Sequence, residues 1–492
     1  MSREITITEI PSDLNPDASL WLYNALDCAV TLEVWEALQE HRTPAANLSY
    51  NFVSAMRGPA LEMMLRGIRI DMEQRGEAIR YYEKKRDRVD KILQQFALAV
   101  WDKPLNPFSS KQCKEFCYEA MKIPEVVSWK KGERKISIDR ETLEKLEVYH
   151  YAKPIVRCIL ASREYEKKLQ VLRQGLDEEQ GGWRMRTSFN VVGTKFGRWS
   201  SSENAFGKGT NFQNVTDELR RMFVPDPGFK LGYFDLEQAE SRAVAYISGD
   251  RNYIAACESG DLHTTSAGLL WSEIKTRAQA DESFYRHFSY RDMSKKGGHG
   301  TNYYGTPFTM AKHLKVPKEL MVEFQAKYFA AFPGIKEWHR SVAKQLQVHG
   351  WLTTALGRQV HFLGRRYDDT TLREAIACEP QSIVAELLNL WLYRVWKDLP
   401  QVQVLAQVHD AILLQYRKEE ENEIVTKVLA LAKTPVNFQS GTLVIPASAE
   451  VGWNWGKVKK DNPYGLAKYK GSDERSEPRT RGLLDRPIHT IL

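Results

Sequence analysis

The segment VQVLAQVHDAILLQY, residues 402–416, places a His-Asp pair in the middle of a run that is otherwise almost entirely apolar. VQVLAQV and AILLQY predict two antiparallel strands, with His409 and Asp410 at the tight turn between them. An ionised carboxylate in such a segment is costly unless a cation or hydrogen bonds compensate its charge. Asp410 is therefore a turn-forming residue, a metal ligand, or both.

A second acidic residue interrupts another β-like segment, FKLGYFDLEQ, at residues 229–238. This segment is rich in aromatic residues and follows a Pro-Gly turn, which predicts a strand. ESRAVAYISGD then predicts a helix that ends at Gly249, so Asp235 lies where strand leads into helix. A turn-forming role is the simpler interpretation of a single such Asp, whereas a bound cation would remove the cost of both carboxylates.

The composition is typical of a soluble globular protein with two to four domain-sized units, since the chain has 492 residues of which 42% are hydrophobic. No apolar run is long enough to predict a membrane span, and the N-terminus lacks a signal-peptide pattern. The six scattered cysteines indicate reduced thiols in a cytosolic compartment. The net charge is +7, of which residues 457–492 carry +4 from nine basic and five acidic side chains. A nucleic-acid site would therefore be a local basic channel.

Residues 20–42, 54–66 and 72–100 show helical periodicity, as do residues 251–349 and 371–399. FSSKQCKEF (108–116) and SIDRETLEKL (137–146) each predict a capping residue followed by a helix. Residues 187–227 are rich in Gly, Ser, Asn and Thr, which favours irregular, contact-bearing backbone. The polar segment after residue 456 is expected to be loosely ordered.

In RDMSKKGGHGTNYYG, residues 291–305, the side chains of Arg291, Lys295, His299 and Tyr303 recur every fourth residue. On a helix they form one stripe of two cations and two rings, which suits a ligand with a polyphosphate and a flat base. A solvated basic helix is the alternative. Each of the three glycines costs about 1 kcal/mol in a helix interior, which favours a helix that needs close approach or movement.

The segment GTKFGRWSSSENAFGKGTNFQNV, residues 193–215, is crowded with hydrogen-bonding side chains. Amide and guanidinium groups of this kind contact phosphate, sugar and base edges. A polar surface loop is the alternative interpretation. The side chains in question are Arg198, Asn204, Asn211, Gln213 and Asn214.

Together these segments resemble DNA polymerase family A, the DNA polymerase I family. DLEQAESR (235–242) is similar to its motif A, the Arg-Lys-His-Tyr stripe to motif B, and VHDAILL (408–414) to motif C. TKFGRWSS (194–201) and NFQN (211–214) precede motif A as in the family. MMLRGIRID (63–71), FSSKQ and SIDRETL resemble its thumb, and AEVGWNW (449–455) its closing strand, so the resemblance covers about residues 45–456.

The resemblance implies a mixed α/β (α+β) fold shaped like a right hand, with helical fingers and an antiparallel palm sheet. Its expected domains are a helical exonuclease remnant (1–44), thumb (45–190), palm (191–250 and 346–456), fingers (251–345) and a basic tail (457–492). The implied activity is template-directed addition of dNTPs to a primer 3′-hydroxyl with two Mg²⁺ ions, or Mn²⁺ in their place.

The resemblance also implies roles for individual residues. Asp235, Asp410 and the backbone carbonyl of Leu236 would bind the metals, and Lys295 would join the two carboxylates in catalysis. The nucleotide would contact Arg291, Lys295, His299, Tyr303 and Glu240, with Glu240 excluding a ribose 2′-hydroxyl. Single-subunit RNA polymerases lack this carboxylate. Primer-template DNA would contact Arg198, Asn211, Gln213, Asn214, Arg373, Gln381 and His409.

Four positions depart from the family pattern. Ala411 stands where motif C usually has Glu, so a supporting carboxylate is missing. His299 replaces the usual Phe or Tyr of motif B, and Tyr304 is inserted before Gly305. Glu237 replaces the usual Ser and adds a carboxylate near the metals. Sugar discrimination beyond Glu240 is therefore not carried over.

Tyr23 and Asp27 resemble the last motif of the family's 3′-5′ proofreading domain, but the other carboxylates have no counterpart in the preceding 22 residues. We interpret this segment as a vestigial helix that caps the polymerase, and the alternative is a split protein whose exonuclease partner is separate. A monomer that needs no membrane is expected, acting with replication accessory proteins in phage or plasmid replication in a bacterial cytoplasm. The rival hypotheses are a nuclease using Asp235 and Glu237, and a catalytically impaired DNA-binding homologue.

Overall fold

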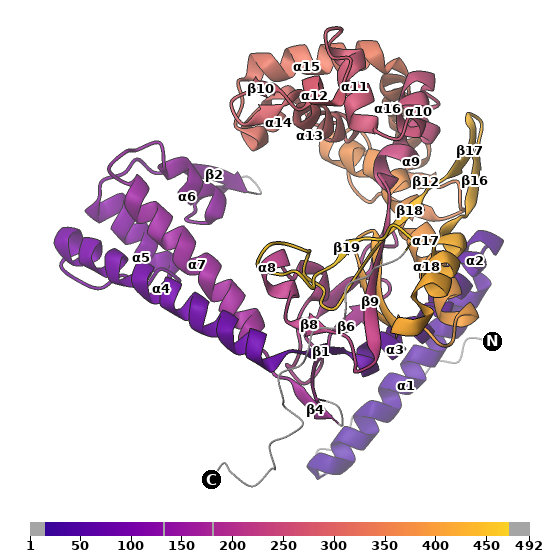
Figure 1. Ribbon diagram of the computed structural model, residues 1–492, viewed down its shortest axis with the longest axis horizontal. Coiled ribbons are helices and arrows are strands. Elements are labelled where there is room, and N and C mark those ends of the chain that lie inside the picture. Colours follow the sequence, from indigo (N-terminus) through magenta and orange to yellow (C-terminus); the bar gives the residue numbers. More distant parts are fainter. Residues whose placement is uncertain (1–14, 131–132, 180–181, 472–492) are drawn as a thin grey trace.

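The computed structural model describes residues 15–130, 133–179 and 182–471. Figure 1 shows a central sheet with one helical group on its left and another above it. Three separate clusters of buried apolar side chains stabilise these parts, one in the palm, one in the fingers and one in the thumb. The predicted mixed α/β right-hand fold is confirmed.

The palm is built on one five-stranded antiparallel sheet with the order β14-β15-β9-β18-β19. The helix α17 (Asp369–Asp398) packs on it, with the Trp391 ring edge-on to Phe234. The strands are β9 (Phe229–Leu236), β14 (Gln403–Val408), β15 (Ala411–Arg417), β18 (Ala447–Gly452) and β19 (Ala467–Lys468).

The predicted hairpin is present in this sheet. Val408 pairs with Ala411, so the turn between β14 and β15 contains only His409 and Asp410. His409 adopts a left-handed backbone conformation with φ 56°. Every residue of β15 from Ala411 to Tyr416 is buried, as are the last five residues of β14. The buried apolar residues of the two strands thus fix the position of His409 and Asp410 at the turn.

The thumb unit is a helical hairpin that projects from the palm (Figure 1). Ser109 and Asp139 cap its short helices, as the sequence predicts: the Ser109 hydroxyl accepts from the Gln112 N–H and the Asp139 carboxylate from the Thr142 N–H. It comprises α4 (Met72–Trp101), α5 (Ser110–Lys114), the π-helix η1 (Glu115–Ala120), β2 (Val127–Lys130), β3 (Glu133–Ile136), α6 (Arg140–Leu146) and α7 (Lys153–Arg173).

The fingers unit is almost wholly helical. A Cβ atom added at Gly297 would lie 2.6 Å from the Phe324 ring, and one at Gly298 would lie 3.0 Å from the Tyr328 ring. These glycines therefore permit close approach of α13 to α15. The unit comprises α10 (Arg251–Glu258), α11 (Leu262–Leu270), α12 (Arg277–Ala280), β10 (Ser283–Tyr285), β11 (Phe288–Ser289), α13 (Tyr290–Asn302), α14 (Pro307–Leu314), α15 (Lys318–Ala331) and α16 (Pro333–His349).

The remaining elements join these parts. A four-stranded sheet with the order β4-β5-β1-β8 lies at the root of the thumb. Its strands are β1 (Ile68–Ile70), β4 (Asp177–Glu179), β5 (Gly182–Met185) and β8 (Phe223–Val224). The others are α2 (Pro44–Ala55), α3 (Arg57–Arg66), β6 (Ser188–Asn190), β7 (Ser200–Ser202), η2 (Phe212–Asn214), α8 (Asp217–Arg220), α9 (Ala239–Ser248), β12 (Trp351–Thr353), β13 (Gln359–His361), η3 (Lys418–Glu420), α18 (Glu421–Ala432), β16 (Pro435–Phe438) and β17 (Gly441–Val444).

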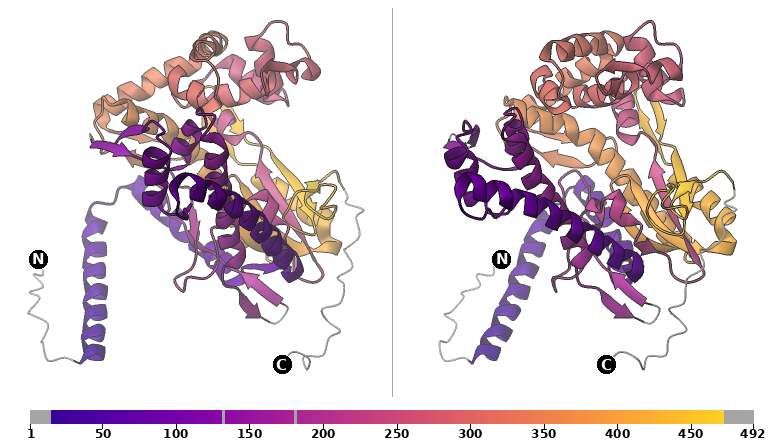
Figure 2. Two further views of the ribbon diagram at one scale, coloured as in Figure 1. Left: turned by 90° about the vertical axis from the view of Figure 1, so that its left-hand side faces the viewer. Right: turned by 60° about the vertical axis from the view of Figure 1, so that its left-hand side comes forward.

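Two predictions about the ends of the chain are corrected. The N-terminal helix α1 (Pro16–Glu40) has no buried residue and stands away from the palm in both views of Figure 2, so it does not cap the polymerase. Residues 457–471, expected to be loosely ordered, instead fold onto the palm, because β19 pairs with β18 and the Tyr469 N–H donates to the Ala449 carbonyl. The rest of the predicted tail, 472–492, and residues 1–14 lie outside the described residues.

No helix among the described residues has both the length and the apolar character needed to cross a membrane. The predicted domain boundaries stay a prediction.

Candidate active site

The palm sheet brings Asp235 and Asp410 together although they lie far apart in the sequence. Ala411, the residue after Asp410, pairs directly with Asp235 in the register of β15 and β9. The Leu236 N–H donates a 3.1 Å hydrogen bond to the Asp410 carbonyl, which ties the end of β9 to the hairpin turn. Asp235 and Asp410 therefore lie at the same end of the sheet, where β9 ends and the β14–β15 hairpin turns.

Burial and neighbouring carboxylates raise the pKa of both Asp235 and Asp410. Removal from solvent, followed by the charges of Asp410 and Glu450, raises the pKa of Asp235 to about 7, although its side chain keeps contact with solvent. Burial and then the charge of Glu240 raise the pKa of Asp410. Glu237, the extra carboxylate of motif A, also contributes to the raised pKa of Asp235. The site thus holds negative charge that neighbouring cations only partly offset.

This donor set fits a hard divalent cation. Two carboxylates and the backbone carbonyl of Leu236 supply oxygen only, and Mg²⁺ is typically bound by one or two carboxylates together with substrate phosphates and water. Within residues 15–130, 133–179 and 182–471, no group of three or more acidic, His or Cys side chains converges as a metal cage.

Glu240 is the centre of a second cluster. It lies in the first turn of α9, where its carboxylate accepts hydrogen bonds from the Arg198 guanidinium and from the Tyr303 hydroxyl, the latter at 2.8 Å. His299 Nδ1 lies 3.9 Å from the same carboxylate. Burial and then the Glu240 charge raise the pKa of Tyr303. Arg198, a predicted DNA contact, thus lies in the same cluster as Glu240, His299 and Tyr303. These three are predicted nucleotide contacts.

The predicted stripe lies on α13, with one difference at its end. A capping box between Ser289 and Asp292 begins this helix. The helix ends at Asn302, so Tyr303 is its C-cap residue and not part of the helical stripe. Arg291 donates to Asp261 at 3.2 Å, whereas Lys295 is exposed to solvent. The helix ends early because Tyr304 takes a left-handed conformation with φ 59°.

The structure adds His263, which the sequence analysis missed. It lies on α11 beside the cationic end of the stripe, and burial followed by the charges of Arg291 and Lys295 lowers its pKa to about 4. Asp261, two residues earlier, has a pKa lowered to about 2: burial acts in the opposite direction, but hydrogen bonds from Thr264 and Arg277 outweigh it. A neutral imidazole beside two cations can still donate one hydrogen bond to a phosphate.

A chain of amide side chains, of which Gln407 and Asn389 are buried and Gln213 is half-buried, links the predicted DNA contacts to the hairpin. Gln213 Nε2 donates to the Trp199 carbonyl at 3.3 Å and to Gln407 Oε1 at 3.1 Å. Gln407 Nε2 donates to Asn389 Oδ1 at 3.2 Å, and Asn389 Nδ2 donates to the Gly197 carbonyl at 3.2 Å. Sequence reasoning missed Gln407 and Asn389, which stand out only as polar residues in apolar segments.

The other predicted DNA contacts are less closely joined to the carboxylates. Asn211 accepts a 2.6 Å hydrogen bond from Ser201. His409 is exposed at the hairpin turn, and Asn214 is exposed at the end of η2. Arg373 donates to the Asp369 carbonyl of its own helix, and Gln381 is half-buried on that helix. No described contact brings Arg373 or Gln381 to Asp235 or Asp410.

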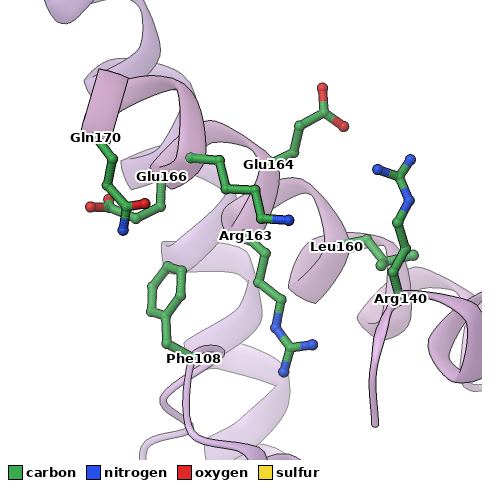
Figure 3. Close-up of a pocket in the computed structure, with 8 residues that line it drawn as sticks. Phe108, Arg140, Leu160, Arg163, Glu164, Glu166 and Gln170 are labelled. Carbon is green, nitrogen blue, oxygen red and sulfur yellow. The ribbon is translucent and has the colours of Figure 1, made fainter. Parts of the chain in front are cut away.

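Two cavities lie away from these carboxylates. One, of about 340 Å³, is in the thumb, where Phe108, Arg140 and Arg163 border it (Figure 3). The other, of about 290 Å³, lies among α9, α16, β12 and the β16–β17 hairpin. Neither is lined by Asp235 or Asp410.

Comparisons with known proteins give a consistent result. The family model described as DNA polymerase family A matches residues 77–457. The chain is 27% identical over 485 residues to DNA polymerase I of Chloroflexus aurantiacus, an alignment that covers 93% of this chain and 48% of that protein. It is 27% identical over 367 residues to the thermostable DNA polymerase I of Thermus aquaticus, covering 71% of this chain and 41% of that one. The chain thus spans about half the length of the curated relatives it matches.

Among solved structures, the fold is similar to that of the POL domain of Pol1 from M. smegmatis, determined in complex with DNA primer-template and dNTP. The TM-score is 0.68 with 22% sequence identity, and the match covers 82% of this chain and 70% of that one. At this identity the likeness establishes the fold alone.

Proposed function

Because this chain belongs to DNA polymerase family A, we propose that it is a DNA-directed DNA polymerase that adds dNTPs to a primer 3′-hydroxyl. The observation that carries the proposal is the pairing of Ala411 with Asp235, which holds the Asp410 carboxylate beside that of Asp235. Two divalent metal ions bound there would stabilise charge on both the attacking and the leaving oxygen. Mg²⁺ fits the oxygen donors best, and Mn²⁺ would bind the same set.

The residues around the carboxylates would position the two substrates. Arg291 and Lys295, with His263 beside them, would hold the triphosphate by charge-assisted hydrogen bonds. His299 and Tyr303 would border the sugar and base. Each of these groups lies on α11, α13 or the residue that follows α13, so one helical unit would carry the nucleotide toward the palm.

Glu240 would set the preference for deoxynucleotides. Its carboxylate is fixed between Arg198 and Tyr303, so it cannot swing aside to admit a ribose 2′-hydroxyl without breaking both hydrogen bonds. Primer-template DNA would contact Arg198, Gln213 and His409, which lie around the hairpin, and also Asn211, Asn214, Arg373 and Gln381.

Primer extension tests the proposal directly. The purified chain with Mg²⁺ and a primed template should incorporate only the dNTP complementary to the next template base. Incorporation without regard to the template, or removal of nucleotides in place of addition, would contradict the proposal. Removal would instead support the nuclease hypothesis that uses Asp235 and Glu237.

We extend the proposal to phage or plasmid replication in a bacterial cytoplasm. The departures at His299 and Ala411 support it, because they set the motifs of this chain apart from the usual family pattern. Replication of the parent phage or plasmid should stop when Asp410 is changed to Ala in its own gene. Undiminished replication in that background would contradict this setting.

A further inference from the structure

The tip of the thumb is joined to the fingers by two ion pairs. Lys312 in α14 donates to Glu141 in α6, and Lys315, the C-cap residue of α14, lies 3.5 Å from Glu144 through Nζ and Oε2. The acidic partners are one turn apart on α6, and the basic partners are three residues apart. This equal spacing matches two charges on one element to two charges on the other.

Each carboxylate is also held within the thumb. Lys145 lies 3.0 Å from Glu141, and Arg140 lies 3.1 Å from Glu144. The hydrogen bond from Lys312, ahead of that from Lys145, lowers the pKa of Glu141. All these side chains keep contact with solvent, so the pairs are weak individually and screened by salt. Contacts of this kind can open and close rapidly.

The two pairs complete a closed path through the molecule. The thumb leaves the palm through α4 and α7, which pack along each other, and the fingers leave it through α9 and α16 (Figure 1). The palm sheet, which carries Asp235 at the end of β9 and Asp410 at the β14–β15 turn, lies between the thumb and the fingers (Figure 1). The contact of α6 with α14 joins the far ends of these two units, so that thumb, palm and fingers together form one closed path.

We propose that the Glu141–Lys312 and Glu144–Lys315 pairs form an electrostatic latch that closes the thumb and fingers into a ring around bound primer-template DNA. This inference rests on the proposed function, since it needs DNA to lie across the palm. The latch opens to admit the duplex and then slows its escape. Its strength falls with ionic strength.

A covalent version of the latch tests the ring. In a Cys28→Ser background, which removes an exposed thiol, Glu144→Cys and Lys315→Cys are joined by a short bismaleimide after the protein is loaded on primed circular single-stranded DNA. The link closes a loop spanning 171 residues that includes thumb, palm and fingers. The protein should then stay on the circle through high salt and detergent, and it should be released when the circle is cut.

Glu147→Cys with Arg157→Cys is the matched control, because this pair lies wholly within the thumb, at 3.3 Å, and closes no ring. Equal loss of both cross-linked proteins from the circle would overturn the proposal. So would cross-linking of residues 144 and 315 that occurs only when DNA is absent. Nucleotides are omitted, so the result is independent of whether the chain synthesises DNA.

Charge reversal tests the electrostatics. Glu141→Lys with Glu144→Lys, and Lys312→Glu with Lys315→Glu, should each make dissociation from primed circular DNA about three- to tenfold faster at low salt. Combining all four changes should recover much of the lost residence time, because the pairs between thumb and fingers are then rebuilt with opposite sign; recovery is incomplete because Lys145 and Arg140 repel the reversed charges at positions 141 and 144. Glu147→Lys and Lys327→Glu control for added or lost charge in each unit. Failure of the fourfold variant to recover, with the controls unchanged, would overturn the latch.

Discussion

Ala411 lies directly opposite Asp235 in the antiparallel pairing of β15 with β9. Side chains at directly opposed positions share one face of the sheet, so residue 411 on β15 is a direct cross-strand neighbour of that carboxylate, as Ser448 is on β18. The Glu that motif C usually has is therefore absent directly beside Asp235, at the site where we propose that the metals bind.

Ala411→Glu should restore a third carboxylate to the site. We expect the Mg²⁺ concentration for half-maximal activity to fall about tenfold, as for other groups that support metal ligands. Thermal stability without metal should fall, because a third negative charge is added beside Asp235. Metal titrations of activity and of Tm check both effects, and Ala411→Gln controls for side-chain size. An unchanged metal requirement would contradict a supporting role for this position.

Asp410→Asn should stabilise the metal-free protein above neutral pH. The pKa of Asp235 is about 7 and that of Asp410 is also raised, so ionising these groups costs folding free energy. The cost is absent below about pH 4, grows as the pH rises through about 7, and is fully present above it. We expect a Tm gain of roughly 1–3 °C in EDTA at pH 8 and none at pH 4. A Tm loss at pH 8 would contradict the like-charge account.

Glu240→Ala should admit ribonucleotides. Loss of this side chain removes the group that Arg198 and Tyr303 hold in place. Discrimination between dNTP and rNTP should fall about ten- to a hundredfold in kcat/KM. Tyr303→Phe removes only the 2.8 Å hydrogen bond and should give a smaller loss. Unchanged sugar discrimination in Glu240→Ala would place the selecting group elsewhere.

Gly297→Ala should destabilise the fingers. Its Cβ would lie 2.6 Å from the Phe324 ring, which must move, at a cost of about 1–3 kcal/mol. Gly76→Ala in α4 is the matched control, since its Cβ meets only the end of Arg80 at 3.4 Å. That change should stabilise the protein by up to about 1 kcal/mol. Denaturant titration checks both, and equal effects would contradict the close-packing explanation.

Gln407→Leu should disturb the palm without touching a carboxylate. It leaves Gln213 and Asn389 without the amide that joins them, at a cost of about 1–3 kcal/mol for unpaired buried groups. The rate of extension from a mispaired primer should change by a larger factor than the rate of correct incorporation, because Gln213 lies among the predicted DNA contacts. Identical mispair extension by the variant and the wild type would show that the amide chain is structural only.

The hairpin and the two Asp positions could be predicted from local pattern, because a two-residue turn between apolar strands leaves few alternatives. Local pattern does not predict where α13 ends. The residue that takes the left-handed conformation after the helix is Tyr304, and a tyrosine does not signal a turn in the sequence. Local pattern also misses His263, whose neighbours Arg291 and Lys295 are distant in the sequence. The order of residues 457–471 arises from backbone pairing with β18, which polar composition does not reveal.

The most direct test of the central claim is single-turnover primer extension by Asp410→Ala in Mg²⁺. The account predicts a loss of at least about a thousandfold in rate with primer-template binding retained, because the metals lose one of their two carboxylates. Glu178→Ala, on the exposed strand β4, should extend the primer like the wild type. Extension by Asp410→Ala at the wild-type rate would contradict the assignment of the hairpin as the catalytic metal site.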